Sequence, residues 1–456
     1  MTLLGTTLDP RDPAYLEGRG ATMQWLAELE AALDEARAGG GEKWVTRHHA
    51  RGKLLPRERI EMLLDQDSPF LELSPVAALG SEFPVGASVV TGIGVVEGVE
   101  CVVIANDPTV DGGAVNPYTA AKIRRAARIA SENRLPLVNL VESSGEAAPA
   151  GSIARELSRL TADRVPTVCV VFGTTSGDAA YLPALSDYTI VVRGHAKMLT
   201  IHPQRTGVEV RATPVVPAGP PGPADQLAED ERDGLRLARQ CVRRFNWRKQ
   251  GPSPRNTRPK EPRYDTEALV SLAAAGPAGF DPREVLARIL DDSDFDEFKP
   301  GQGSVLVAGW GELHGYPVGV LASPGIWLSP AESQKAVHFL QLANATATPV
   351  LFLRHPGEIK KSDDADVRHD APLVHAVAKS TVPHLVLTIG PEPGGSPDRA
   401  DQPRFQFSWP RPSAEPAAAD DGVIDPRDTR TVLGLCLSAV HSAAVAGAEH
   451  VGVFRP

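Results

Sequence analysis

The amino-acid sequence predicts an α/β protein made of two copies of one domain. A buried strand at Val165–Gly173 is followed by a turn of small residues and by the start of a helix at Ala179–Leu185. The same order returns 217 positions later, where Val382–Gly390 has the composition of a strand and Pro391–Ser396 that of a turn. Predicted strands and helices alternate before the first turn, which is typical of a largely parallel, buried sheet.

The duplication continues upstream of the two turns. The helix and strand predicted for Lys122–Gly145 have a counterpart at Lys335–Gly357, and the two segments are offset by 213 positions. This period is far longer than that of a solenoid, so it indicates a repeated domain. Each copy is therefore expected to present one turn of small residues.

A proline-rich stretch at 250–265 is expected to link the two domains. We assign residues 1–50 to an N-terminal helical segment, residues 51–262 to a first domain and residues 263–456 to a second. In the N-terminal segment, apolar residues recur at helical spacing and predict one amphipathic helix over 10–39.

The first domain is expected to begin with a helix whose first residue is Pro56, because proline suits the first helical position. A turn signal at Glu97–Glu100 separates two apolar runs and predicts a hairpin. The elements predicted from the hairpin onward are strands at 87–96 and 101–105, a helix at 118–133, a strand that ends at Glu142–Gly145, a helix at 152–163 and a strand at 167–172.

Composition limits the possible functions. The chain has 456 residues, 42% of them hydrophobic, and a net charge of −10, which argues against nucleic acid or an anionic membrane as the main partner. No run of apolar residues is long enough for a membrane span, and the first residues do not resemble a secretory leader, so we expect a cytoplasmic protein. The cysteines lie far apart and are expected to be reduced core residues: Cys101, Cys169, Cys241 and Cys436.

Some histidines and arginines could suggest a binding site, but each has a simpler interpretation. His48 and His49 lack a third metal ligand near by and are expected to be surface residues. The basic run at 236–249 could contact phosphates, although a solvated helix face is the favoured interpretation.

The two turns are the best candidates for a catalytic site. A strand, a tight turn and a helix start direct backbone N–H groups and the positive end of a helix dipole at one point. Such a point can stabilise an oxyanion that develops during a reaction. A plain connection inside an α/β domain has the same sequence pattern, so the turns alone do not decide between a catalytic site and a structural connection.

Several longer motifs resemble the carboxyltransferase (β) subunits of biotin-dependent acyl-CoA carboxylases, nearest to the methylcrotonyl-CoA and propionyl-CoA carboxylase branches. The motifs are His48–Arg51 with Leu55–Ile60, Asn106–Thr109, Glu142–Gly145, Phe295–Pro300, Ser333–Asn344 and Asp420–Gly434. The resemblance implies two tandem crotonase-like domains, each a spiral of β-β-α units. It also implies an acyl-CoA substrate, biotin carried by a biotin carboxylase or carrier partner subunit, no metal, and assembly as a homo-oligomer.

The resemblance also implies site residues. The residues placed at the two oxyanion turns are Asp178, Ala179, Gly394 and Gly395, and those placed in substrate binding are Ser143, Ser144, Gly145 and Tyr181. Each turn would stabilise one oxygen, the ureido oxygen of biotin or the enolate oxygen of the thioester.

The sequence departs from the family pattern at the first turn. The family has Ala-Gly-Gly-Ala-Tyr where this chain has Gly177–Tyr181, so Asp178 and Ala179 replace two glycines. The carboxylate of Asp178 can cap the free N–H groups or repel an enolate. Other loops depart from the family pattern as well. The segments 146–152 and 411–420 are shorter than in the family, 213–224 has the composition of a proline-rich linker, and 358–366 is charged where the family has a loop of tyrosine and glycine.

Three functions therefore remain open from the sequence. The first is an acyl-CoA carboxylase subunit that transfers CO2 from carboxybiotin to the α- or vinylogous carbon of an acyl-CoA. The second is a non-catalytic relative that binds acyl-CoA or joins a carboxylase complex. The third is an acyl-CoA decarboxylase that does not use biotin. The short segment at 411–420 further predicts a dimer in preference to the hexamer common in the family.

Overall fold

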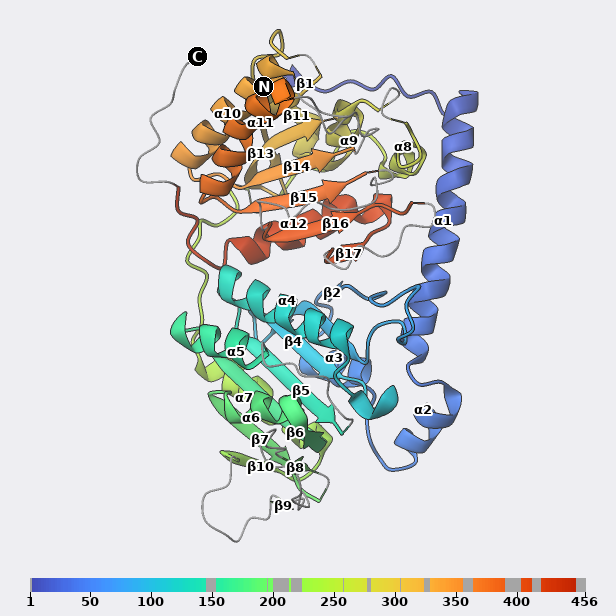
Figure 1. The fold of residues 1–456 in the computed structure, drawn as a ribbon, viewed down its shortest axis with the longest axis vertical. Coiled ribbons are helices and arrows are strands. Elements are labelled where there is room, and N and C mark those ends of the chain that lie inside the picture. The colour runs from blue at the N-terminus through green and yellow to red at the C-terminus, as the bar shows by residue number, and fades with distance from the viewer. Residues whose placement is uncertain are drawn as a thin grey trace. The chain divides into compact units, whose positions relative to one another are not determined.

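The computed structural model of the chain describes residues 2–144, 153–194, 196–199, 213–214, 224–256, 258–276, 280–303, 305–323, 329–355, 364–389, 403–411 and 420–447. At 177–178, 197–199, 213–214 and 364–370 it describes the backbone but not the side chains. The chain divides into two compact units, Ala31–Arg248 and Met1–Glu30 with Lys249–Pro456. Each unit contains one β-sheet, which confirms the predicted tandem α/β architecture (Figure 1).

The sheet of the Ala31–Arg248 unit has seven strands on its main path, within the described residues, in the order β10-β7-β6-β5-β4-β3-β2. β2, β3 and β4 are antiparallel, and β4, β5, β6, β7 and β10 are parallel to one another. The bounds are β2 Leu71–Leu73, β3 Val89–Val96, β4 Val99–Asn106, β5 Leu137–Ser143, β6 Thr167–Ser176, β7 Tyr188–Val192 and β10 Gln226–Ala228, with β8 Lys197–Leu199 and β9 Thr213–Pro214 beside β6.

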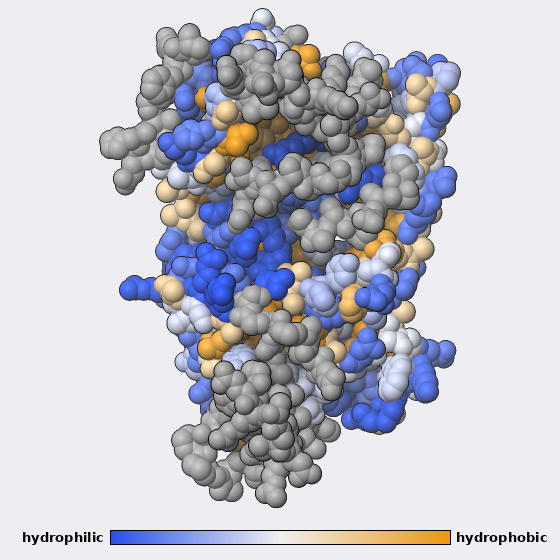
Figure 2. Space-filling model, in the orientation of Figure 1, coloured by the Kyte–Doolittle hydropathy of each residue, from blue (hydrophilic) through white to orange (hydrophobic). Residues whose placement is uncertain are grey.

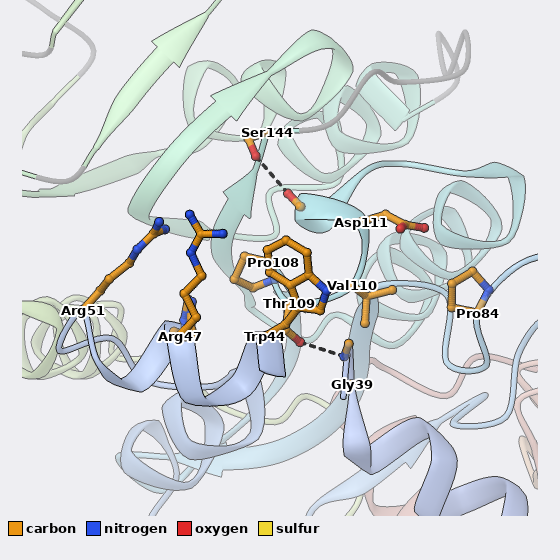
Figure 3. Close-up of a pocket in the computed structure, with 13 residues that line it drawn as sticks. Gly39, Trp44, Arg47, Arg51, Pro84, Pro108, Thr109, Val110, Asp111 and Ser144 are labelled. Carbon is orange, nitrogen blue, oxygen red and sulfur yellow. Dashed lines mark hydrogen bonds between the residues drawn. The ribbon is translucent and has the colours of Figure 1, made fainter. Parts of the chain in front are cut away.

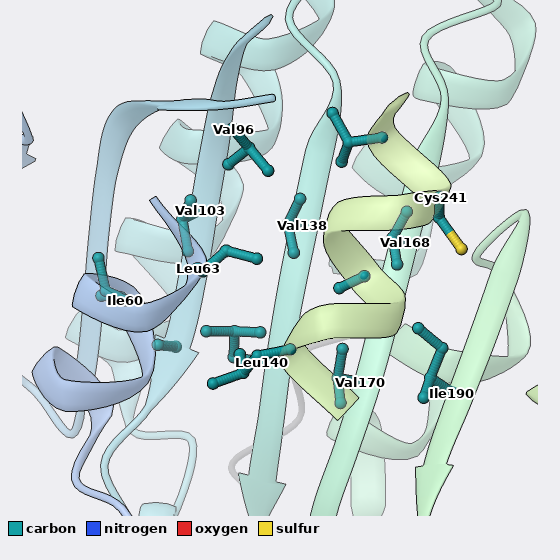
Figure 4. Packing of buried hydrophobic residues seen from close by; sticks show 14 of the residues in the cluster. Ile60, Leu63, Val96, Val103, Val138, Leu140, Val168, Val170, Ile190 and Cys241 are labelled. Atoms are coloured by element: carbon teal, nitrogen blue, oxygen red, sulfur yellow. The ribbon is translucent and has the colours of Figure 1, made fainter. Parts of the chain in front are cut away.

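Helices cover both faces of this sheet. Their bounds are α2 Glu42–His49, α3 Pro56–Leu63, η1 Asp111–Gly113, α4 Pro117–Asn133, α5 Ile153–Ala162, η2 Gly177–Ala180, α6 Tyr181–Ala184 and α7 Glu231–Arg244. Figure 4 shows α3 and α7 on one side of the strands, where Leu63 and Cys241 meet buried side chains such as Val138 and Val168. This cluster is almost fully buried, so it supplies the main hydrophobic stabilisation of the unit.

The second unit contains the other sheet, with eight described strands in the order β1-β11-β12-β13-β14-β15-β16-β17. β1, β11, β12 and β13 pair antiparallel, and β13 to β17 pair parallel. The strand bounds are β1 Thr2–Leu3, β11 Asp294–Glu297, β12 Val307–Leu313, β13 Tyr316–Ser323, β14 Val350–Arg354, β15 His384–Thr388, β16 Phe405–Ser408 and β17 Gly422–Val423. The helix bounds are η3 Thr266–Ala268, α8 Leu269–Leu272, α9 Pro282–Ile289, η5 Asp291–Ser293, α10 Pro330–Ala345, α11 Asp364–Lys379, η6 Pro426–Asp428 and α12 Thr429–Val440.

The N-terminal helix α1 spans Pro13–Ala38, which confirms the helix predicted over 10–39. The division between the two units falls inside this helix, after Glu30. Gly39 follows the helix with a φ of 56°, a left-handed conformation that glycine adopts at little cost and that commonly ends a helix.

The crossover helices of the two units begin in the same way. Asn116 precedes α4, and its side-chain oxygen accepts a hydrogen bond of 2.8 Å from Thr119 N, while Pro117 takes the first helical position. Ser329 precedes α10 with the same kind of cap, and Pro330 follows it. Each start therefore combines a capping side chain with a residue that needs no N–H partner.

The hairpins of the two units show the duplication in atomic detail. The β3–β4 turn has positive φ at Glu97 and Gly98, and Asp65 accepts hydrogen bonds of 2.9 and 2.7 Å from their N–H groups. The β12–β13 turn has positive φ at His314 and Gly315, and the carboxylate of Asp291 accepts from both of their N–H groups at 2.9 and 2.8 Å. Two-residue turns of this kind match the twist of the strands that they join.

An arginine completes each of these hairpin supports. Arg239 on α7 donates to Asp65 at 2.8 Å and to Leu63 O at 2.7 Å. Arg430 on α12 donates to Asp291 at 2.8 Å and to Ile289 O at 2.7 Å. Bidentate arginine–glutamate pairs recur in the same way. Arg57 with Glu72 joins α3 to β2, and Arg283 with Glu297 joins α9 to β11. The same supports thus recur in both copies of the fold.

At the first turn, the predicted end of the strand is wrong and the predicted helix is confirmed only in part. The strand expected to end near Gly173 continues as β6 to Ser176. The helix expected from Ala179 to Leu185 is divided into the 3-10 helix η2 and the four-residue α6, which begins at Tyr181. Part of the reason is pairing with β8, which aligns Thr174–Ser176 with Lys197–Leu199 and keeps the backbone extended past Gly173.

The described surface in Figure 2 carries hydrophilic residues interspersed with small hydrophobic areas. Exposed large hydrophobic side chains include Leu16, Trp44, Tyr181 and Val374. Among the helices that the structure describes, none combines the length and the apolar character that a membrane span requires. The four cysteines are free and buried, as the sequence predicts.

Candidate functional site

A pocket of about 610 Å³ lies in the Ala31–Arg248 unit, where the ends of β4 and β5 face α2 (Figure 3). One wall comes from α2 and the residues just after it, and the other from the Pro108–Gly112 loop that follows β4. Ser144, which follows β5, lies at the rim. In α/β sheets, ligands bind preferentially beyond the carboxyl ends of parallel strands, so the position of this pocket is typical of a substrate site.

The α2 wall presents an aromatic ring and cationic side chains. Trp44, Arg47 and His48 line the pocket from one face of α2, and Arg51 lines it from the turn that follows the helix. Trp44 is 47% exposed, and Arg47 lies over its ring with 5.5 Å between the guanidinium carbon and the ring centroid. Figure 3 shows Arg47 and Arg51 extending from this wall toward the part of the pocket below Ser144.

His48 was expected at the surface, and this prediction is wrong. The residue is buried, and its Nε2 lies 3.1 Å from Leu54 O. Burial lowers the pKa of His48, and the cations of Arg59 and Lys53 add to this effect, although Glu142 opposes it. His48 is therefore a neutral wall residue at pH 7. The neighbouring His49 is exposed, as predicted, and pairs with Glu58.

The opposite wall depends on a close approach between glycine backbone and a loop. A Cβ atom on Gly40 would lie 1.8 Å from Thr109 O, so no larger residue fits there without a shift of the loop. Gly40 N also donates to Thr109 Oγ1 at 3.0 Å. Thr109 is itself held by Asp107, which accepts hydrogen bonds from its N–H and hydroxyl groups. Gly39 and Gly40 therefore follow the end of α1 and also line the pocket.

The two serines predicted in substrate binding have different surroundings. Ser143 is buried, and its hydroxyl donates to Gly113 O at 2.6 Å. Ser144 is exposed at the pocket rim, and its N–H and hydroxyl groups contact Gly112 O at 2.9 and 3.2 Å. Only Ser144 is placed where it can contact a molecule in the pocket.

The remaining predicted site residues do not line this pocket. Ala179 is buried in η2, and Tyr181 begins α6 with 47% of its surface exposed. For Asp178 the structure describes the backbone, which lies in η2. Gly145, Gly394 and Gly395 lie outside the described residues, as do most of the shortened loops.

Sequence reasoning missed the pocket-lining roles of Trp44, Arg47 and Arg51. The signal was present as the three-residue spacing of Trp44 and Arg47 on α2, with Arg51 in the turn that follows the helix. What the sequence does not provide is the loop after β4 that lies opposite. The basic run of α7 was predicted to be a solvated helix face. Arg236 agrees with this, since it pairs with Asp233 at the surface, whereas Arg239 pairs with Asp65 and supports the β3–β4 hairpin.

The pocket combines two arginines, a partly exposed indole ring and polar groups at its rim. Among the residues that the structure describes, Arg47 and Arg51 have no carboxylate partner in an ion pair, so their guanidinium groups can bind an anion. In the same described ranges, no group of three or more His, Cys, Asp or Glu side chains is arranged to hold a metal ion. The fold and the pocket define a duplicated α/β protein whose first unit carries a pocket lined by two arginines and a half-exposed indole ring.

Comparison with known proteins identifies the family. Residues 47–411 match the carboxyl transferase domain. The chain is 43% identical to a probable biotin-dependent acyl-coenzyme A carboxylase beta2 subunit of Mycobacterium tuberculosis, over 99% of this chain and 100% of that protein. It is 33% identical to the mitochondrial methylcrotonoyl-CoA carboxylase beta chain of Dictyostelium discoideum, over 99% of this chain and 91% of that protein. The chain belongs to the carboxyl transferase family.

A solved structure supports the fold assignment. The beta subunit of geranyl-CoA carboxylase from P. aeruginosa superposes with a TM-score of 0.81 at 29% identity, over 99% of this chain and all of that one. The two sheets are therefore tandem crotonase-like domains, as the resemblance implied. The alignment with the mycobacterial relative runs over 530 positions, whereas this chain has 456 residues, so the relative carries segments that this chain lacks.

Proposed function

We propose that this protein is the carboxyltransferase subunit of an acyl-CoA carboxylase and that the pocket beside α2 binds its acyl-CoA substrate. The observation that carries the proposal is the match to the carboxyl transferase domain over residues 47–411, a range that contains most of the pocket. Relatives that match this chain over nearly its whole length are carboxyltransferase subunits of acyl-CoA carboxylases.

The chemistry of the pocket suits coenzyme A. Its phosphate groups need cationic donors, and Arg47 and Arg51 provide planar forks that can bind phosphate oxygens in pairs. Its adenine needs an aromatic or apolar surface, and the Trp44 ring, which is 47% exposed and has Arg47 over it, lies in the pocket. The volume of about 610 Å³ lies within the range of about 300–1,000 Å³ that is usual for small-molecule sites.

The reaction requires groups that stabilise negative charge on oxygen. An acyl-CoA that loses a proton next to its thioester carries the charge on the thioester oxygen, and backbone N–H groups can hold that oxygen. We assign this role in the first domain to the turn at Gly177–Ala180. Biotin, carried by a partner subunit, supplies the carboxyl group when it is bound. Backbone N–H groups of the turn would stabilise the oxyanion, whereas the acidic residue Asp178 would oppose it, so we expect weak activity.

We further propose that the protein works with a biotin carboxylase or biotin carrier subunit and forms a homo-oligomer, most simply a dimer. The names of its relatives support the first point. We also place it in the cytoplasm, because its four buried, free cysteines suit a reducing compartment. Light scattering at micromolar concentration tests the oligomer, and a stable hexamer would contradict the dimer.

The function is tested by an assay of carboxyl transfer with purified protein. The carboxylated acyl-CoA product is measured for several acyl-CoA substrates, with a biotinylated carrier and biotin carboxylase present or absent. Product that forms only with the carrier supports the proposal. Decarboxylation of malonyl- or methylmalonyl-CoA without the carrier would instead identify a decarboxylase, and binding of acyl-CoA without either reaction would identify a non-catalytic relative.

A further inference from the structure

A buried ion network lies next to the pocket. Arg59 on α3 is fully buried and donates to Glu142 at 2.7 Å and to Glu231 at 2.9 and 3.0 Å. Lys53 donates to the other oxygen of Glu142 and lies 3.4 Å from Phe172 O. The network therefore contains two cations and two carboxylates, all with side chains at most 11% exposed.

The network is linked to the α2 wall and to the rim of the pocket. Glu142 is followed directly by Ser143 and Ser144, so it fixes the end of β5 at the rim. Glu231 accepts a hydrogen bond of 3.0 Å from Leu54 N. The carbonyl of the same residue, Leu54 O, lies 3.1 Å from the ring of His48 in the α2 wall. The four charged groups thus join the α2 wall to the strand that carries the rim.

Little room is left around Glu142. A Cβ atom on Gly173 would lie 2.3 Å from Glu142 Oε1, so a larger residue there would displace the Glu142 side chain. Burial by itself raises the pKa of Glu142, but Arg59 and Lys53 outweigh burial and leave the pKa below its ordinary value. Glu142 is consequently a carboxylate at neutral pH, held in one place by its two cations.

The second copy of the fold does without this network. Arg57 of α3 and Arg283 of α9 form equivalent ion pairs in the two copies. When these two arginines are aligned, Val285 takes the position of Arg59. The offset of the two repeated strands likewise places His355 where β5 has Glu142. Both copies keep the hairpin and helix supports, so the fold does not require the network. Burial of charged pairs seldom increases stability over apolar packing, which also favours a role other than stability.

We infer that Glu142 and Arg59 are positioning residues of the acyl-CoA pocket, which hold the α2 wall and the β5 rim at the spacing that coenzyme A needs. This inference rests on the proposed function for the identity of the ligand. It concerns residues that do not line the pocket themselves, since neither is among its lining residues.

The test compares two substitutions that each replace a buried, arginine-paired carboxylate with an amide. Glu142→Gln weakens the network, whereas Asp291→Asn weakens the hairpin support with Arg430 in the other unit. Coenzyme A affinity is measured by calorimetry, and backbone hydrogen exchange is measured for residues 42–54. We expect Glu142→Gln to raise the Kd for coenzyme A about tenfold, equivalent to about 1.4 kcal/mol, and to speed exchange in 42–54. Asp291→Asn should change neither quantity.

Two results would overturn the inference. In the first, Glu142→Gln binds coenzyme A like the wild type; in the second, Asp291→Asn shows the same loss. If Glu142→Gln does not fold, Lys53→Met removes one cation at the edge of the network and should raise the Kd by a smaller factor, and an unchanged Kd would again overturn the inference. A wild-type protein that fails to bind coenzyme A would contradict the proposed ligand. In that case the positioning role is tested by hydrogen exchange alone, and it would be contradicted if Glu142→Gln left the exchange of residues 42–54 unchanged.

Discussion

Lys122 and Lys335 occupy equivalent places in the two copies of the fold. Lys122 Nζ donates to Val89 O at 2.7 Å and to Gly86 O at 3.2 Å. Lys335 Nζ donates to Leu306 O at 2.7 Å and to Gly303 O at 3.4 Å. Each lysine therefore joins the crossover helix to the start of the first long strand of its unit. The same contact in both copies shows the duplication at the level of single side chains. It also explains the buried lysine, because its ammonium group donates to backbone carbonyls.

The buried state of Lys122 predicts a pH dependence of stability. Burial lowers its pKa to about 8, whereas in the unfolded chain it keeps the ordinary value of 10.5. Between these two values the unfolded state binds more protons, so the free energy of unfolding should rise with pH. Lys122→Met removes this contribution.

Urea unfolding of wild type and Lys122→Met between pH 7 and pH 10 measures the effect. The stability of the wild type should increase relative to that of the variant as the pH rises through about 8. Parallel curves over this range would show that the pKa of Lys122 is not lowered in the folded protein.

Gly40→Ala is expected to damage the pocket wall. The added Cβ would lie 1.8 Å from Thr109 O, and because this atom belongs to the backbone, the loop itself must move. We expect a loss of about 1–3 kcal/mol in the free energy of unfolding, together with weaker acyl-CoA binding.

Gly20→Ala is the matched control, because nothing lies within 4 Å of its added Cβ and the residue sits inside α1. This change should raise stability by about 0.5–1 kcal/mol, as alanine is the better helix former. Gly40→Ala with unchanged stability and binding would mean that the loop tolerates the shift.

The first turn should limit activity through Asp178. If its carboxylate opposes the developing oxyanion, the wild type should transfer carboxyl groups at a rate at least about a hundredfold below that of a family member with glycines, the scale of one lost donor. The double variant Asp178→Gly with Ala179→Gly should recover part of the rate, because it removes the charge and allows close backbone approach.

Asp178→Asn separates charge from shape in the same assay. It should recover part of the rate if the charge is the obstacle. A double variant that loses activity would instead make Asp178 a working acid or base.

The sequence predicted the elements that depend on local pattern and internal repetition. The helix predicted over 118–133 is observed at Pro117–Asn133, between two strands that the sequence also predicted. The four cysteines followed from their apolar neighbours. Comparison of the two copies also gave the tandem architecture without any knowledge of contacts.

The sequence could not predict features that depend on distant partners. His48 is buried beside Leu54 O and close enough to Glu142 to be affected by its charge, and Glu142 lies far along the chain. β6 extends past Gly173 because it pairs with β8. The pocket itself requires α2 and the loop after β4 to face each other, which no local pattern specifies.

The central claim is that Arg47 and Arg51 hold the phosphates of acyl-CoA, and calorimetric titration with coenzyme A tests it most directly. The double variant Arg47→Ala with Arg51→Ala should raise the Kd at least about tenfold, or about 1.4 kcal/mol, and reduce its dependence on salt. The control is Arg159→Ala with Arg236→Ala, which removes the same charge from two exposed arginines of the same unit that do not line the pocket. The control should bind like the wild type. A double variant at the pocket that binds coenzyme A as tightly as the control would contradict the claim.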